Sequence, residues 1–154
     1  MNRVRPTTIL LLAALVAFLA SWLAPVFSTP IVWAPDPVTL FTPAPGTETY
    51  RGYRVFWTVL GLLWSPDGPE GWKDALNFAR YIASSLTNVV FLVAVTALLS
   101  GWVRALPALQ WLVLASAVLD LYWWFEMDHL QIGYCLWIAA FFLLFVAMAR
   151  RSGA

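Results

Sequence analysis

The sequence contains little charge, one histidine and one cysteine. Only 11% of its 154 residues are charged, against a usual share of about a quarter. Nine basic and eight acidic residues leave a net charge of +1, which argues against nucleic acid as a partner. The lone cysteine, Cys135, excludes an intrachain disulfide, and no CxxC or Cys–His zinc pattern is present.

The common motifs of catalysis and nucleotide binding are also missing. There is no GxSxG elbow, no HExxH, no P-loop and no Gly-rich dinucleotide fingerprint. A serine–histidine pair would have to join His129 to Ser84 or Ser85, and no motif supports that pairing. We therefore predict a protein that is not an enzyme and that carries no cofactor and no metal.

Apolar residues are what the sequence has in excess. They make up 62% of the chain, and ten of them are tryptophans. A membrane-spanning helix needs about 20 mostly apolar residues, and four segments qualify. These are residues 8–27, 82–99, 106–125 and 130–149. Because backbone groups must be satisfied inside lipid, we predict an all-α integral membrane protein, a single domain with four transmembrane helices in a bundle.

The first apolar segment resembles a signal peptide in part. Arg3 and Arg5 form a basic start, residues 9–20 are apolar, and residues 26–28 offer a small-residue cleavage site. The apolar stretch continues past the usual length of a signal peptide, which favours an uncleaved anchor. A cleaved leader is the alternative.

Charge placement predicts the orientation of the helices. The short connection at residues 101–105 carries Arg104, and Arg150 and Arg151 follow the last apolar segment. The turn on the opposite side, residues 126–129, contains only acids and a histidine among its charged or titratable residues. Basic residues favour the cytoplasmic side, so we predict that the N- and C-termini are both cytoplasmic.

The stretch at residues 28–81 is the one long connection, and we expect it on the outer side. Five prolines in its first half forbid a regular helix and favour extended or turn structure across the outer helix ends. The uncharged run at residues 55–64 is too short to span a membrane and predicts an interfacial helix. Residues 72–81 then predict a helical approach to the second span.

Four polar side chains are expected at one depth beneath the outer surface. At 1.5 Å per residue, Asp120 lies about 8 Å below its helix end, Asn88 and Ser21 about 9 Å, and Tyr134 about 6 Å. In one interpretation these groups bond to one another and fix helix register. In the other, Asp120 binds a ligand or handles a proton, as intramembrane carboxylates often do.

Two further features allow a plain structural interpretation. Glu126, Asp128 and His129 form a possible polar cluster at the outer surface, but a short turn cannot direct all three inward to a metal. They are expected to cap helices, with Asp128 as an N-cap. Trp137 lies about two turns into the last apolar segment, away from the interfaces, and is expected to be a packing residue.

The layout resembles small four-helix bacterial inner-membrane proteins of unassigned function. The matching residues are Gly52-Tyr53, the run at 55–64, Asn88, and the stretch from Gly133 to Trp137. Where such proteins often have Trp-Leu-Ala-Asn, this chain has Ser-Leu-Thr-Asn, ending at the same Asn88. The resemblance implies the fold and a location in the bacterial inner membrane, and it supplies no catalytic residues.

Three functions stay open at this level. The first is a non-enzymatic accessory or assembly subunit that packs against other membrane subunits in the bilayer. The second is an immunity-type protein that recognises a toxin, an outer-side protein partner, through its outer loop. The third is a small enzyme or carrier that acts on a lipid through the layer around Asp120.

Overall fold

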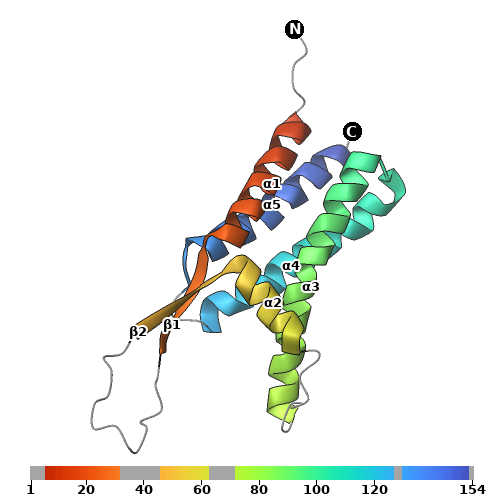
Figure 1. Cartoon of the computed structure of the whole chain (residues 1–154). Coiled ribbons are helices and arrows are strands. Elements are labelled where there is room, and N and C mark those ends of the chain that lie inside the picture. The colour runs from red at the N-terminus through yellow and green to blue at the C-terminus, as the bar shows by residue number, and fades with distance from the viewer. Residues whose placement is uncertain (1–5, 32–45, 63–71, 127–129, 153–154) are drawn as a thin grey trace, which may run out of the picture.

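The computed structural model describes residues 6–31, 46–62, 72–126 and 130–152. The chain is mainly helical there, with five α-helices, one 3-10 turn and a two-stranded sheet (Figure 1). In chain order the elements are α1 (Pro6–Leu23), β1 (Pro25–Ile31), β2 (Gly46–Arg51), α2 (Gly52–Leu62), α3 (Trp72–Ser100), η1 (Val103–Ala105), α4 (Leu106–Glu126) and α5 (Ile132–Ser152).

Four of these helices, α1, α3, α4 and α5, are long and apolar enough to cross a membrane, which confirms the prediction of four such helices. Their bounds differ from the predicted ones. The predicted approach and the second span are one continuous helix of 29 residues, α3. Helix α1, in contrast, ends earlier than predicted, at Leu23 instead of residue 27. Pro25 explains that early end, because proline disfavours helical geometry at the preceding Ala24 and cannot donate a backbone hydrogen bond.

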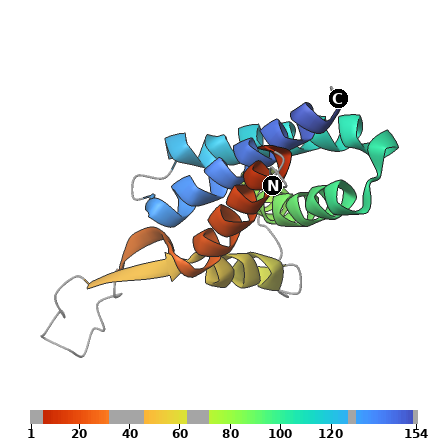
Figure 2. The ribbon, with the colours of Figure 1, turned by 90° about the horizontal axis from the view of Figure 1, so that it is seen from above.

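The helices are arranged so that both chain ends lie at one end of the molecule (Figures 1 and 2). Helix α1 packs along α5, α5 also packs against α4, and α4 packs against α3. The start of α1, the end of α5 and the α3–α4 connection lie together, and the sheet and α2 lie toward the other end. This arrangement places Arg104, Arg150 and Arg151 at one end, whereas Arg51 of β2 and Arg54 of α2 lie toward the end that holds the sheet.

The α3–α4 connection is closed by a helix cap and by an arginine. Gly101 has a φ of +75°, and the amide of Trp102 donates to the carbonyl of Ala97 at 3.0 Å. These are the features of a Schellman cap, which satisfies carbonyls at the end of a helix. Arg151 of α5 donates to the carbonyl of Leu98 and joins the ends of the two helices.

The segment between α1 and α3 contains a β-hairpin that the sequence did not predict. Strand β1 pairs antiparallel with β2, with Phe27 opposite Tyr50 and an irregularity between Pro25 and Phe27. At that irregularity the carbonyl of Val26 accepts from the amide of Gln131 at 2.8 Å. The hairpin is thereby tied to the start of α5. Helix α2 follows β2 directly and begins at Gly52, three residues before the predicted interfacial run.

The apolar core lies between α1, α3, α4 and α5. The rings of Phe18 and Phe91 stack with their centroids 4.1 Å apart, and Phe141 meets Phe91 edge-on at 5.3 Å. Fully buried alanines, such as Ala14 and Ala140, let the helix backbones approach closely. Small residues and stacked rings therefore set the spacing of these helices.

Two glycines are positions where the chain has no room for a side chain. A Cβ atom at Gly52 would lie 2.5 Å from the carbonyl oxygen of Ser21, and one at Gly133 would lie 2.5 Å from that of Pro25. Both obstacles are backbone atoms, one in the last turn of α1 and the other at the start of β1. The starts of α2 and of α5 therefore hold the turn from α1 into β1 between them.

We predict that Gly52→Ala and Gly133→Ala each lower the free energy of unfolding by about 1–3 kcal/mol, because the backbone must shift to admit the methyl group. The matched control is Gly61→Ala in α2, where a Cβ meets nothing within 4 Å. That change should be neutral or stabilising by up to about 1 kcal/mol, as for alanine in a helix interior. Unfolding in detergent, followed by circular dichroism, measures all three, and equal effects at the three glycines would contradict the prediction.

Candidate functional site

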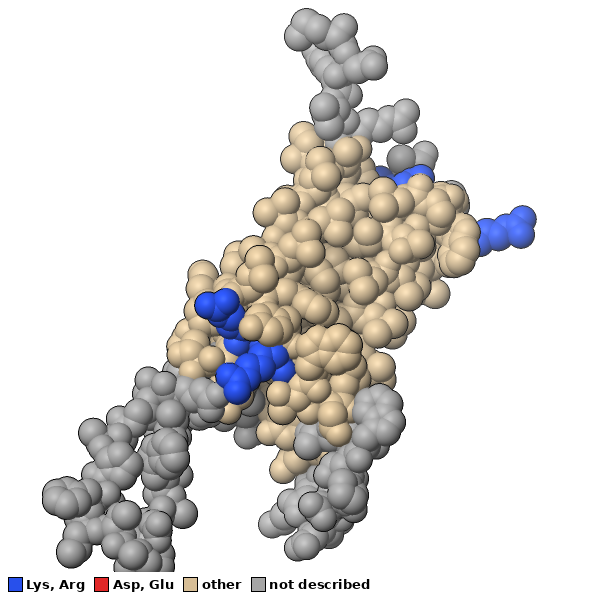
Figure 3. Space-filling model, viewed as in Figure 1, with Lys and Arg blue, Asp and Glu red and all other residues tan. Residues whose placement is uncertain are grey.

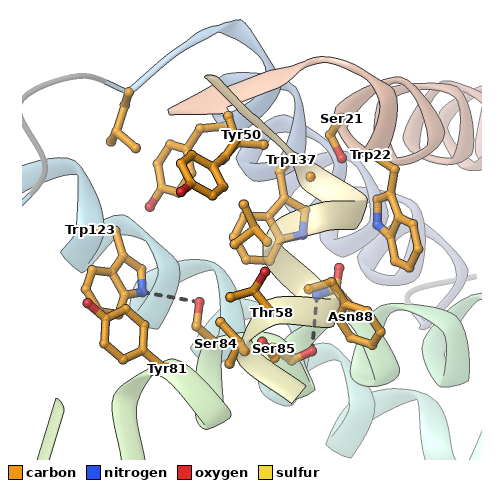
Figure 4. Close-up of a pocket in the computed structure, with 17 residues that line it drawn as sticks. Ser21, Trp22, Tyr50, Thr58, Tyr81, Ser84, Ser85, Asn88, Trp123 and Trp137 are labelled. Carbon is orange, nitrogen blue, oxygen red and sulfur yellow. Dashed lines mark hydrogen bonds between the residues drawn. The ribbon is translucent and has the colours of Figure 1, made fainter. Parts of the chain in front are cut away.

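A pocket of about 390 Å³ lies beneath α2, between that helix and the long helices (Figure 4). Its lining comes from α1, α2, α3, α4 and α5, from both strands and from Leu130. Figure 4 shows side chains from these separate elements directed into one space, with Trp137 near its centre. The pocket therefore exists only when distant parts of the chain are assembled.

Aromatic rings form a large part of the wall. Tyr81 of α3 stacks on Trp123 of α4 with centroids 4.9 Å apart. On the other side Trp22 of α1 meets Phe56 of α2 at 5.3 Å. Trp137 of α5 lies between these two pairs in Figure 4. Rings fixed by contacts with one another make a wall that keeps its shape without many hydrogen bonds.

One part of the lining connects to a buried polar group. Ser84 of α3 donates its hydroxyl to a carboxyl oxygen of Asp120, Oδ1, at 2.7 Å and accepts from the indole Nε1 of Trp123 at 3.2 Å. Asp120 of α4 is completely buried, and the hydroxyl of Tyr134 of α5 donates to its backbone carbonyl. Side-chain hydrogen bonds therefore join α3, α4 and α5 at one level. We call Ser84, Asp120, Trp123 and Tyr134 the polar link.

Asp120 itself does not line the pocket, because Ser84 lies between them. Its second carboxyl oxygen, Oδ2, has no hydrogen-bond partner among the described residues. Thr87 approaches the carboxyl group, but its hydroxyl is donated to the carbonyl of Ser84 at 2.5 Å. The Ser84 hydroxyl is engaged as donor and as acceptor, which holds it as a link between helices and not as a free nucleophile.

The structure brings the four predicted polar residues to one region, although only two of them touch. Tyr134 bonds to Asp120, while Asn88 and Ser21 line the pocket with Tyr134. Asn88 donates to the carbonyl of Ser85 at 3.1 Å, and Ser21 donates to that of Phe18 at 2.6 Å. The side chains of these two residues are bonded within their own helices.

The polar cluster predicted at the outer surface falls on side chains that the structure does not describe. Asp128 and His129 lie outside the described residues, and so does the side chain of Glu126 at the end of α4. Within the described ranges, no group of three His, Cys, Asp or Glu side chains is placed to hold a metal ion.

The combination of residues that lines the pocket was not predicted from the sequence. Trp137 was expected in packing and does pack against the core beside Phe141, but its place in a pocket and the contribution of α2 were not foreseen. The indole Nε1 of Trp137 is buried and has no partner in the described part of the chain. A tryptophan inside a span, away from both interfaces, was the one available signal.

No family model, curated protein or solved structure matches the chain. The resemblance to small four-helix inner-membrane proteins accordingly stays a prediction.

We predict that Asp120→Ala lowers the free energy of unfolding by about 1–3 kcal/mol, because it leaves the buried Ser84 hydroxyl without its acceptor. Asp120→Asn keeps an oxygen for Ser84 and should cost less than about 1 kcal/mol. Ser100→Ala is the control, since that exposed serine bonds only within α3. Unfolding in detergent tests the series; an Asp120→Ala protein as stable as the control would exclude a structural role for the polar link.

Proposed function

We propose that this chain is a multi-pass membrane protein that binds a lipid-like molecule in its pocket without transforming it. The observation that carries the proposal is the pocket of about 390 Å³, which seven elements border and mainly apolar side chains line. Sites for small molecules have this character: concave, mostly apolar, with a few placed polar groups, and usually about 300–1,000 Å³ in volume.

Insertion in a membrane is supported by the outward faces of the long helices. Large apolar side chains are exposed there, with Val16 of α1 66% exposed and Trp111 of α4 68% exposed. Exposed apolar surface on this scale is unfavourable in water and ordinary in lipid. On the face seen in Figure 3, one group of basic side chains lies at the upper right and another over the lower half, and the described surface between them carries no charged side chain, a pattern that suits a bilayer.

The orientation proposed from the sequence suits this arrangement. Arg104, Arg150 and Arg151 belong to the end where α3 and α5 finish, and the positive-inside tendency assigns that end to the cytoplasm of a bacterial cell. The pocket, the hairpin and α2 then face the outer leaflet of the inner membrane. A lipid-like molecule would reach the pocket from that leaflet.

Binding is favoured over catalysis by the state of the polar groups. Ser84, the pocket residue bonded to the carboxyl group of Asp120, has its hydroxyl held by two hydrogen bonds. No charged side chain lines the pocket among the described residues. A protein of this kind holds, presents or senses a lipid, which is the carrier form of the third function left open by the sequence.

The other two functions have weaker support. An accessory subunit would use exposed apolar helix faces, but lipid contact accounts for the same faces. An immunity-type protein would use the outer loop, whose residues 32–45 and 63–71 lie outside the described ranges. Neither function accounts for a pocket of this size and apolar lining.

The orientation is tested with single cysteines in a Cys135→Ala background. Thr49→Cys on β2 and Arg104→Cys on η1 are both at exposed positions. In cells with a permeable outer membrane, a membrane-impermeant maleimide should label Thr49→Cys, and Arg104→Cys only after the inner membrane is disrupted. The reverse pattern would show that the proposed orientation is inverted. Equal labelling of both positions in intact cells would show that no membrane separates them.

The pocket is tested by filling it. Val59 of α2 lines the pocket and is 8% exposed, whereas Val118 of α4 is 59% exposed on an outer face. Lipid extracted from purified Val59→Trp protein should be about tenfold less per molecule than from wild type, with Val118→Trp unchanged. Mass spectrometry quantifies the lipid. If both variants retain the wild-type amount, or if folded wild type carries none, the proposed function fails.

A further inference from the structure

The pocket contains one buried hydrogen-bond donor that the protein leaves unused. This donor is the indole N–H of Trp137, which has no partner among the described residues. Trp137 lines the pocket, and Figure 4 shows its ring among side chains that come from the other helices. Buried N–H groups in folded proteins are nearly always paired, so an unpaired one at a cavity wall suggests where a ligand atom belongs.

Several of the neighbouring polar groups are already committed to the protein. Ser21 donates to Phe18, Asn88 to Ser85, and Ser84 to Asp120. Each of these bonds lies within a helix or joins two helices, and each would have to break before that N–H or O–H could serve a ligand. The Trp137 N–H is a buried donor of the lining that has no partner among the described residues, so a ligand can take it at no cost to the fold.

The electrostatics of the lining select the charge of the ligand. Of the described residues around the pocket, none is lysine, arginine, aspartate or glutamate. A carboxylate or phosphate inside such a lining would lose its hydration without gaining an opposite charge. A cation would face the same loss, apart from the attraction of aromatic faces. A neutral hydrogen-bond acceptor has neither penalty.

We infer that the pocket binds a neutral lipid-like molecule whose carbonyl oxygen accepts a hydrogen bond from the indole N–H of Trp137. The apolar body of that molecule lies against Trp22, Phe56 and Val59 beneath α2. An ester of a glycerolipid and the ring carbonyl of a quinone share this chemistry. This inference rests on the proposed function and adds the identity of the polar contact.

The test uses three probes with the same twelve-carbon chain: methyl dodecanoate, dodecane and ionised dodecanoate. Native mass spectrometry of the folded protein in detergent measures the occupancy of each. Methyl dodecanoate should bind best, and Trp137→Phe should reduce its binding about tenfold, the value of one neutral hydrogen bond, while leaving dodecane within about twofold. Trp22→Phe is the matched control, because it removes similar ring volume from the same wall and should affect methyl dodecanoate and dodecane alike.

The outcomes distinguish the carbonyl contact at Trp137 from lipid binding itself. If dodecane binds the wild type as well as methyl dodecanoate, or if Trp137→Phe and Trp22→Phe have the same pattern, the carbonyl contact is excluded and lipid binding stands. Preferential binding of dodecanoate would exclude a neutral ligand. If none of the probes binds the folded wild type, the proposed function fails together with this inference. A benzoquinone with a short isoprenoid tail and a short-chain diacylglycerol, compared in the same way, then distinguish the two sources of the carbonyl.

Discussion

The turn from α1 into β1 is the point on which the rest of the structure depends. Two glycines from distant parts of the chain pack their backbones against it, Gly52 on Ser21 in the last turn of α1 and Gly133 on Pro25 at the start of β1. The first contact fixes where α2 begins, and the second fixes where α5 begins. Because α2 is the cover of the pocket and α5 supplies Trp137, the cavity has its shape only while α1 ends at Leu23.

The second constraint is that polar groups within apolar spans must find partners inside the protein. Ser84, Asp120 and Tyr134 do so by joining α3, α4 and α5, and Asn88 and Ser21 do so within their own helices. This use of hydrogen bonds stabilises the arrangement of helices and removes those groups from ligand recognition. The polar layer therefore acts mainly as a structural element at the edge of the pocket. In the proposed binding mode, the selectivity of the pocket comes from the indole N–H of Trp137, which this network does not use.

The sequence predicts the parts of this fold that depend on local composition. Long apolar runs identify the four long helices, and depth along each helix places Asp120 and Tyr134 at one level, where they are bonded. The hairpin could not be predicted in this way, because its pairing joins residues on either side of a proline-rich stretch. Nor could the pocket, because contacts such as Trp22 with Phe56 follow from the packing of α2 and from no local pattern.

Helix α2 connects the pocket to the question of partners. Its inner face places Val55, Phe56 and Val59 on the cavity, whereas Trp57 is 64% exposed on the other side. Phe56 and Trp57 meet edge-on at 5.5 Å, so the inner ring is in contact with the exposed one. Helix α2 packs on α1 and α3, and the close approach of Gly52 to Ser21 holds its start. A molecule in the pocket and a partner on the outer face would therefore act on the same helix, and binding a lipid is compatible with reporting it to another subunit.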